Sequence, residues 1–359
     1  MITERKTCRL CDSPVKWVFS LTPTPIANDY KLEPDSKAHC YPLELTQCTR
    51  CNHVQQRYLI SGLFEDYKYT TPATVARYLD PTAKLIKARF PEAKTVLEIG
   101  SNNGTYLRVL EDNDFLAYGV DPAATGYHNF KNYFSEQWAK DHSGTGYDLI
   151  IANNVLAHID DLQDVFRGIN HLLAENGAVI FEVQYLPDLI QSASFDMIYA
   201  EHMSYHTVEP LKTFLFRHGL VMTHVDHMPL HGGSVRITAQ RTGYETDWVD
   251  SAPDWIQFAE DVECARMNIR NKLHDKKVVV FGAAAKATTL IHHCGIKDNI
   301  SYCIDDTPAK QGRYLPGTDI KICPTSECKD GETIFMCAWN YEKEIHEMFP
   351  NSTLIHPFK

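Results

Sequence analysis

The sequence has neither a long apolar run nor an excess of positive charge. No hydrophobic segment approaches the roughly 20 residues that cross a bilayer, so a membrane-spanning protein is excluded. Lysine and arginine together number 35, against 46 aspartates and glutamates, which gives a formal net charge of -11. Because proteins bind phosphate backbones through basic side chains, nucleic acid is a disfavoured partner. Residues 1–6 lead directly into a cysteine motif, which predicts a cytoplasmic protein.

The cysteines do not follow the pattern of a disulfide framework, and the composition is not that of a disordered chain. There are 11 cysteines, an odd number, and those beyond residue 260 stand singly, which indicates reduced thiols. Hydrophobic residues make up 44% and charged residues 23%, as in ordinary globular proteins. At 359 residues the chain exceeds the usual size of one hydrophobic core, so two or three domains are expected.

Changes in pattern along the chain divide it into three expected domains. Residues 1–72 are rich in cysteine, proline and tyrosine and predict a small, loop-rich module. Residues 73–245 alternate helical and strand patterns, and residues 246–359 repeat that alternation in a shorter unit. Such alternation predicts an α/β fold, in which a mostly parallel, Rossmann-like sheet carries helices on both faces. The predicted strands are 95–100, 116–121, 147–152, 178–183, 277–282 and 300–305.

Two short cysteine pairs in the first domain predict a zinc site. Cys8 and Cys11 form one Cys-x-x-Cys pair, and Cys48 and Cys51 form the second. Each pair offers two thiolates to one ion, and tetrahedral zinc takes four ligands, so a closed structural site is expected. The spacer between the pairs is longer than in common zinc ribbons. Possible substitute ligands are therefore His39, Cys40 and His53.

A glycine-containing loop after the first strand of the second domain predicts a cofactor site. Gly100 and Gly104 bracket a turn that follows Glu98, and Asn102 lies between them. Glycine allows a tight turn and a close approach of the backbone to a ligand. Asp121 ends the next strand, where a carboxylate can accept the two ribose hydroxyls of a nucleoside. Dinucleotide sites carry Gly-x-Gly-x-x-Gly, so this pattern favours S-adenosylmethionine.

The sequence resembles the sugar C-methyltransferases, which act on nucleotide-linked keto sugars in deoxysugar biosynthesis. The resemblance implies a central class I methyltransferase domain, an N-terminal zinc-binding module and a C-terminal Rossmann-like domain that binds the nucleotide-sugar. It is carried almost end to end by the two cysteine pairs and by segments 97–104, 152–158, 199–202, 231–234 and 282–286.

The predicted catalytic groups follow the third and fourth strands of the central domain. Asn153 and His158 come directly after strand 147–152, at the carboxyl edge where open α/β sheets bind ligands, so we expect both near the cofactor. Tyr199 and His202, three residues apart, would share one face if the segment is helical. A phenol and an imidazole could then act on one substrate atom, and Glu201 either orients His202 or is a solvated charge.

The resemblance implies a role for each of these groups. Carbon attacks a methyl sulfonium only after a proton next to a ketone is removed and the enolate oxygen is stabilised. His202 is the implied base, with Tyr199, Glu201 and His158 around the sugar. One tyrosine of the segment 67–70, either Tyr67 or Tyr69, is implied to reach the same site from the first domain. Its spacing does not decide between the two.

The remaining predicted substrate contacts lie around the junction with the last domain. Strand 277–282 runs into a small-residue turn with Lys286, which could hold a phosphate, although the family usually has glycine where this chain has Ala287. Segment 305–312 resembles the family's second loop. The residues expected to line the sugar pocket are His231, Gly232, Ser234 and Arg236.

The sequence therefore predicts methyl transfer from S-adenosylmethionine to a carbon of a nucleotide-linked 4-keto sugar, with C3 the favoured position. One alternative is methylation of an oxygen or nitrogen on another small molecule or on RNA, against which the acidic net charge argues. A second is a non-catalytic zinc-ribbon protein that uses its α/β domains only for binding. The intact set of Glu98, Gly100, Gly104 and Asp121 disfavours it.

Overall fold

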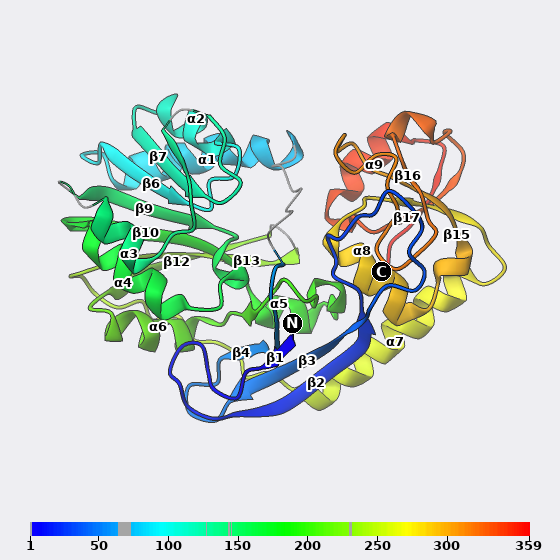
Figure 1. Cartoon of the computed structure of the whole chain (residues 1–359), viewed down its shortest axis with the longest axis horizontal. Coiled ribbons are helices and arrows are strands. Elements are labelled where there is room, and N and C mark those ends of the chain that lie inside the picture. The colour runs from blue at the N-terminus through cyan, green and yellow to red at the C-terminus, as the bar shows by residue number, and fades with distance from the viewer. Residues whose placement is uncertain (1, 64–72, 127, 143, 145, 230–231) are drawn as a thin grey trace.

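The computed structural model describes residues 2–63, 73–126, 128–142, 144, 146–229 and 232–359, with side chains from residue 78 onward in the first helix. Tyr67, Tyr69 and His231, predicted as site residues, lie outside the described residues. The described strands form four sheets. Figure 1 shows the seven-stranded sheet in one lobe, the five-stranded sheet in a second lobe, and the N-terminal strands extended beneath both.

The N-terminal module is more regular than the predicted loop-rich domain. Strands β1 (Ile2–Glu4) and β5 (Tyr58–Ile60) form an antiparallel pair. A second antiparallel sheet has the order β11-β4-β3-β2, and its strands are β2 (Val15–Thr24), β3 (Tyr41–Cys48), β4 (Val54–Gln56) and β11 (Ser204–Tyr205). Pro23 lies within β2, an edge strand whose pairing shifts register between Leu21 and Thr24. Edge strands and bulges tolerate proline because no ladder hydrogen bond is lost there.

The central sheet confirms the predicted doubly wound α/β fold. Its order is β12-β13-β10-β9-β6-β7-β8, and only β13 runs antiparallel to its neighbours. The strands are β6 (Thr95–Ile99), β7 (Leu116–Asp121), β8 (Asn129–Lys131), β9 (Tyr147–Asn153), β10 (Leu173–Gln184), β12 (Val221–Met228) and β13 (Ser234–Gln240). The chain leaves β6 in one direction towards β7 and later returns on its other side as β9. The carboxyl ends of β6 and β9 therefore flank the switch point where such folds bind ligands.

Helices cover both faces of the central sheet. The helices of this region are α1 (Ala73–Arg89), α2 (Thr105–Glu111), α3 (Glu136–Asp141), α4 (Leu162–Leu172), α5 (Leu186–Gln191) and α6 (Val208–Arg217). One apolar cluster joins α1 and α2 to one face, and another joins α3, α4 and α6 to the other. Two short 3-10 turns are η1 (Leu156–His158), which follows β9, and η2 (Phe195–Met197), which follows α5. Both lie at the carboxyl edge of the sheet.

The C-terminal lobe is a smaller parallel α/β unit. Its sheet has the order β16-β15-β14-β17-β18, with every pair parallel. Its elements are α7 (Trp255–Leu273), β14 (Val278–Phe281), α8 (Ala285–Cys294), η4 (Lys297–Asn299), β15 (Ile300–Ile304), β16 (Ile322–Cys323), η5 (Thr325–Glu327), β17 (Thr333–Met336), η6 (Trp339–Tyr341), α9 (Glu342–Met348) and β18 (Thr353–Ile355). No helix in the described part of the chain is both long and apolar enough to cross a membrane.

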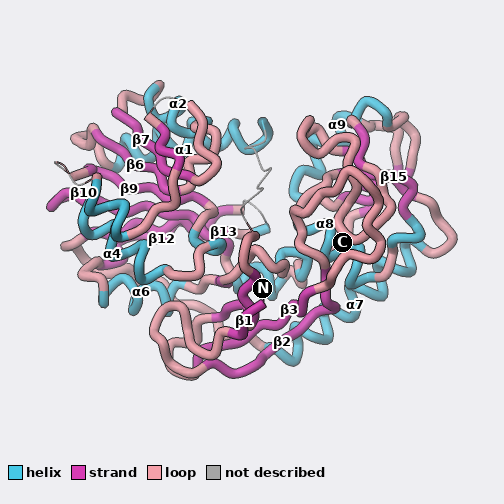
Figure 2. The backbone as a smooth tube through the Cα atoms, in the orientation of Figure 1, coloured by secondary structure: helices cyan, strands magenta, loops and turns pink. Residues whose placement is uncertain are grey.

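The lobes share one apolar core with the N-terminal strands. A single cluster of buried residues contains Phe19 of β2, Phe195 of η2 and Phe258 of α7. The rings of Phe19 and Phe258 lie 4.8 Å apart. Figure 2 shows α7 beside β2, beneath the C-terminal lobe. Because apolar burial is the main stabilising term in folding, this shared core fixes the lobes relative to the module.

Candidate active site

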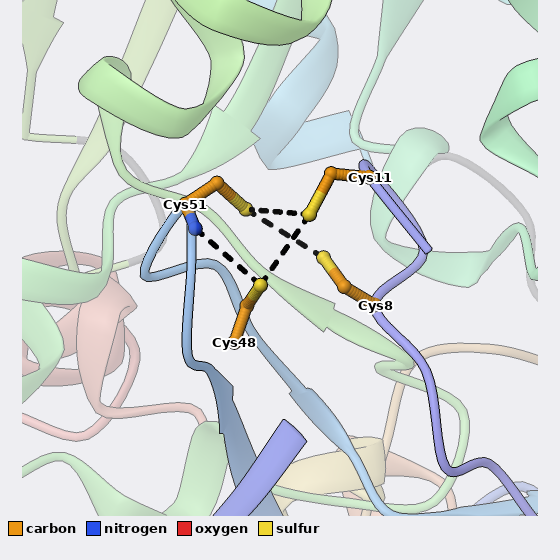
Figure 3. A group of neighbouring side chains, drawn as sticks. All are labelled: Cys8, Cys11, Cys48 and Cys51. Carbon is orange, nitrogen blue, oxygen red and sulfur yellow. Dashed lines mark hydrogen bonds between the residues drawn. The ribbon is translucent and has the colours of Figure 1, made fainter. Parts of the chain in front are cut away.

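The four predicted cysteines converge, as Figure 3 shows. Their sulfur atoms lie within 4.8 Å of one another, with contacts of 3.4 Å between Cys11 and Cys48 and 3.6 Å between Cys8 and Cys51. These separations are far too long for disulfides. They suit thiolates around one tetrahedral zinc, whose sulfur ligands at about 2.3 Å lie about 3.8 Å apart. The donor set therefore fits zinc, and its four positions leave none open for catalysis.

The three substitute ligands lie outside this cluster. Cys40 is exposed, and the ring of His39 packs edge-on against Tyr41. His53 is fully buried, with Nε2 3.3 Å from the Ser204 hydroxyl. The long spacer between the cysteine pairs is accounted for by the β2–β3 hairpin, which returns the chain to the first pair.

The loop after β6 has the tight turn that the sequence predicts. Gly100, Asn102 and Gly104 all adopt positive φ, at 79°, 49° and 72°. A Cβ on Gly100 would come within 2.8 Å of the Val155 side chain. Glycine is required here because the loop packs directly on the segment after β9, which carries His158.

Two buried side-chain oxygens near this loop make no hydrogen bond within the described part of the chain. Among the described residues, Glu98 Oε2 and Asn153 Oδ1 are buried without a hydrogen-bond partner. Burial, and then the charge of Asp121, raise the pKa of Glu98 to about 8. Asp121 ends β7, where its Oδ1 accepts from the Ala123 amide at 2.6 Å, and burial raises its pKa. Buried orphaned acceptors beside a glycine turn fit the polar groups of a nucleoside cofactor.

The segment 199–202 is a turn, not a helix, but it still brings Tyr199 and His202 together. The His202 amide donates to the Tyr199 carbonyl at 3.0 Å, and the Tyr199 hydroxyl donates to His202 Nε2 at 2.6 Å. His202 Nδ1 donates to the Met197 carbonyl at 3.0 Å. A carbonyl only accepts, so Nδ1 carries the ring proton and Nε2 the lone pair. His202 is thus held in the tautomer that can act as a base.

His158 lies beside this pair. Its ring centroid is 4.8 Å from that of His202, and its Nδ1 donates to the Glu201 carbonyl at 2.7 Å. Burial lowers the pKa of His158, so the ring is neutral and its Nε2 carries a lone pair. The enolate oxygen requires a hydrogen-bond donor. In this tautomer Nε2 of His158 accepts, which leaves the Tyr199 hydroxyl as the donor.

The Glu201 side chain does not orient His202, since the Met197 carbonyl does so. It is also not a solvated charge, because Glu201 has 0% exposure. Its Oε1 accepts from both the amide and the side chain of Asn28, each at 3.0 Å. Burial raises its pKa. Asn28 comes from the N-terminal module, and nothing in its sequence context distinguishes it.

The predicted phosphate lysine is packed inside the junction of the lobes. Lys286 Nζ lies 2.6 Å from Asn340 Oδ1 and 4.1 Å from the centre of the Trp339 ring. Trp339 donates to buried Asp196 of η2 at 2.7 Å, and a Cβ on Gly232 would come within 2.6 Å of the same ring. Burial lowers the pKa of Lys286 to about 8. Trp339, Asn340 and Asp196 carry no sequence signal, because only the packing of two distant segments unites them.

The backbone of the turn before Lys286 is already engaged. The Ala283 amide donates to Asp305 at 2.9 Å, and the Ala283 carbonyl accepts from the Tyr30 hydroxyl at 2.6 Å and from Lys310 at 2.8 Å. Tyr30 comes from the N-terminal module. The predicted phosphate turn thus binds the chain's own side chains at Ala283, and the sequence did not indicate Tyr30.

Two further predicted sugar contacts lie on β13 with other partners. Arg236 pairs with Glu182 at 3.1 Å and donates to Thr82 at 3.0 Å, with only 6% of each charged side chain exposed. The buried ion pair joins β13 to the neighbouring strand β10. The sequence had instead predicted a contact between Arg236 and the sugar. Ser234 is fully buried at the start of the same strand.

Comparison with known protein families matches three stretches of the chain. Residues 8–61 match the model described as "Putative zinc binding domain", residues 68–225 a methyltransferase domain, and residues 245–352 a C-methyltransferase C-terminal domain. The order of the three is the one predicted, while the domain limits near residues 72 and 245 stay predictions. The match of the last stretch favours carbon over oxygen or nitrogen as the methyl acceptor.

One curated relative is similar along nearly the whole chain. It is "C-methyltransferase NovU" of Streptomyces niveus, 28% identical over 94% of this chain and 90% of its own length. Solved structures of methyltransferases match about half of the chain. They include the magnesium protoporphyrin IX methyltransferase of Synechocystis (14% identity, 49% of this chain, 90% of that chain, TM-score 0.36). Another is the 1,6-didemethyltoxoflavin-N1-methyltransferase of Burkholderia thailandensis (13% identity, 54% of this chain, 98% of that chain, TM-score 0.37).

Proposed function

We propose that the chain is an S-adenosylmethionine-dependent C-methyltransferase with a zinc-binding domain, and that its acceptor is a nucleotide-linked 4-keto sugar methylated at C3. The proposal is supported by the hydrogen-bonded pair of Tyr199 and His202, packed beside His158. The loop that carries His158 also packs on the glycine turn of the cofactor site. A base and a hydroxyl donor near the methyl donor are the groups that carbon methylation next to a ketone requires.

The cofactor site is formed by groups at the ends of β6, β7 and β9. We assign Asp121 to the ribose hydroxyls, and Glu98 and Asn153, with their orphaned oxygens, to the remaining polar groups of the cofactor. Gly100, Asn102 and Gly104 shape the turn that admits it. S-adenosylmethionine supplies the methyl group when bound.

His202 acts as the base, and Tyr199 acts as the hydrogen-bond donor to the substrate oxygen. Without substrate, the phenol donates to Nε2 of His202. When the keto oxygen takes over that hydrogen bond, Nε2 is released and accepts the proton from C3, which leaves an enolate. Tyr199 then stabilises the negative charge that develops on the oxygen. The C3 carbon of the enolate would then take the methyl group as the methyl–sulfur bond of S-adenosylmethionine breaks, with S-adenosylhomocysteine as the leaving group. The Met197 carbonyl keeps the second ring nitrogen protonated, so His202 receives the proton only at Nε2.

The nucleotide end of the substrate is assigned to the junction of the lobes. Gly232 of the central domain lies against Trp339, and Trp339 lies against Lys286. The lysine is the charged group at this junction that could pair with a diphosphate. Tyr67, Tyr69 and His231 remain proposed contacts to the sugar.

The test combines product analysis with exchange at the reacting carbon. The protein and cofactor are incubated with a small panel of 4-keto nucleotide-sugars, and products are followed by mass spectrometry. Deuterium exchange next to the ketone is followed by NMR. We expect one added methyl group, and loss of both exchange and methylation in His202→Ala. His224→Ala is the matched control because that side chain is 52% exposed on β12, and it should retain both.

The outcomes separate the possible bases and acceptors. Exchange that survives in His202→Ala but is lost in His158→Ala would move the base to His158, whose Nε2 also carries a lone pair. Cofactor binding without exchange or methylation of any sugar in the panel would refute the keto-sugar acceptor.

A further inference from the structure

A buried amide in the zinc-binding module contacts the catalytic turn directly. Gln56 ends β4 and is 1% exposed. Its Nε2 lies 3.3 Å from both the Tyr199 carbonyl and the Tyr205 hydroxyl. Its backbone amide donates to the Met203 carbonyl at 3.0 Å. Gln56 thus bonds to the turn on both sides of His202.

The bond to Tyr199 lies at the point that closes the turn. The Tyr199 carbonyl also accepts from the His202 amide at 3.0 Å. The Tyr199 carbonyl oxygen therefore accepts one hydrogen bond from within the turn and one from Gln56 of the zinc-binding module. The orientation of the Tyr199 ring, and hence its 2.6 Å bond to His202, depends on this backbone position.

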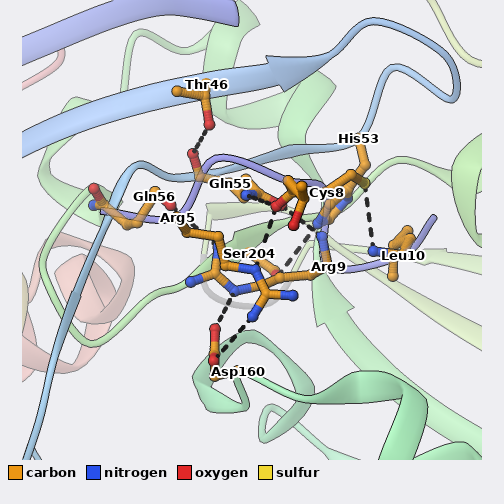
Figure 4. Close-up of polar contacts among 11 residues, drawn as sticks. Arg5, Cys8, Arg9, Leu10, Thr46, His53, Gln55, Gln56, Asp160 and Ser204 are labelled. Atoms are coloured by element: carbon orange, nitrogen blue, oxygen red, sulfur yellow. Dashed lines mark hydrogen bonds and ion pairs between the residues drawn. The ribbon is translucent and has the colours of Figure 1, made fainter. Parts of the chain in front are cut away.

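Gln56 is in turn fixed to the cysteine cluster through Arg9, as Figure 4 shows. Arg9 follows Cys8 in the sequence, and its Nη1 donates to the Gln56 carbonyl at 3.1 Å. Its Nε pairs with Asp160, two residues after His158, at 3.0 Å. Gln55 accepts from the Arg9 amide at 2.8 Å. Arg9, the residue after Cys8, therefore contacts both segments of the active site. It reaches the His202 turn through Gln56 and the His158 segment through Asp160.

We propose that Gln56 is a positioning residue, which transmits the rigidity of the cysteine-bound module to the Tyr199–His202 turn. The inference rests on the proposed function in taking His202 as the base. A displacement of about 1 Å at a reacting group can lower turnover roughly 100-fold, so a side chain that never touches substrate can control the rate.

Gln56→Met tests this because it keeps the length and burial of the side chain and removes the donor. Gln55→Met is the matched control. Gln55 is the preceding residue on β4, is also fully buried, and directs its amide to Thr7 and Arg9 instead of the turn. Both variants lose a buried hydrogen bond, so they should lose similar stability. Gln56→Asn, which shortens the side chain but keeps the amide, is a milder second variant.

Four readouts are measured on the full-length, zinc-loaded protein: zinc content, cofactor affinity, turnover with its KM, and a histidine ring resonance. We expect Gln56→Met to keep its zinc content and its affinity for S-adenosylmethionine, and to lose turnover roughly 10- to 100-fold with little change in the KM for the sugar. The fourth readout needs no sugar substrate. It is the ring resonance of His202 in protein labelled with ¹³C at histidine Cε1, assigned with His202→Gln. The Tyr199 ring lies 4.0 Å from that of His202, so a displaced turn shifts this resonance.

The proposal is supported if Gln56→Met shifts the His202 resonance and lowers turnover. Both changes should be weaker in Gln56→Asn and absent from Gln55→Met. An unmoved resonance with normal turnover overturns it, and so does Gln55→Met reproducing both changes, since general destabilisation then explains them. If the parent protein methylates no keto sugar, the proposed function fails. The His202 resonance of Gln56→Met alone then decides the positioning role.

Discussion

The buried carboxyl of Glu98 makes the stability of the cofactor-free protein depend on pH. Burial, followed by the charge of Asp121, raises its pKa from 4.5 to about 8. The unfolded chain therefore releases this proton near pH 4.5, and the folded chain keeps it up to about pH 8. Each pH unit between these values lowers the free energy of unfolding by about 1.4 kcal/mol. The raised pKa of Glu98 thus lowers the free energy of unfolding by about 3 kcal/mol at pH 7 and by about 5 kcal/mol above pH 8.

Glu98→Gln removes this ionisation while it keeps the shape of the side chain. The free energy of unfolding of the variant, relative to the parent, should rise steadily from pH 5 to pH 8 and then level off. It is measured by urea denaturation of cofactor-free protein, followed by tryptophan fluorescence at several pH values. The exposed Glu92→Gln on the loop before β6 is the control, and its difference from the parent should not change with pH. A constant difference for Glu98→Gln over this range would refute the argument.

Three further results are expected. Gly100→Ala places a methyl group 2.8 Å from Val155 at a φ of +79°, so calorimetry should show at least a tenfold loss of affinity for S-adenosylmethionine, partly restored by Val155→Ala. Arg236→Met leaves the Glu182 carboxylate buried without its partner and should lower the free energy of unfolding by about 3 to 5 kcal/mol. Adding Glu182→Gln should recover part of that loss in the same urea titration. Cys48→Ser should lower the zinc content measured by elemental analysis, together with the melting temperature.

The sequence was informative where a function depends on residues close together along the chain. The central strands β6, β7, β9, β10, β14 and β15 were predicted because buried strands read as short apolar runs. The outer strands of both sheets, namely β8, β12, β13, β16, β17 and β18, were not predicted. The zinc site was predicted because the two cysteines of each pair are only three residues apart in the sequence. The Tyr199–His202 contact also follows from a three-residue spacing, although a turn produces it in place of the expected helix.

Contacts between distant segments were not predictable in this way. Asn28 reaches Glu201 across 173 residues of the sequence, and Tyr30 reaches Ala283 across 253. Both are ordinary polar residues in an irregular segment, and only the folded backbone places them. The partners of Arg236 were missed for the same reason, since Glu182 lies on the neighbouring strand β10. Hydrophobic periodicity reports which face of an element is buried and does not report what lies against it.

The pairing of β4 with β11 has a consequence for the order in which the protein is made. The sheet of the N-terminal module is completed by Ser204 and Tyr205, and its apolar core includes Phe258 and Ile355 from the other end of the chain. Domains generally fold as they leave the ribosome, the N-terminal one first. Here the edge of β4 stays unpaired until residues 204–205 have been made, and the apolar face stays partly open until Phe258 and Ile355 follow. Such edges promote aggregation, so the module made first is the one most in need of protection by a chaperone.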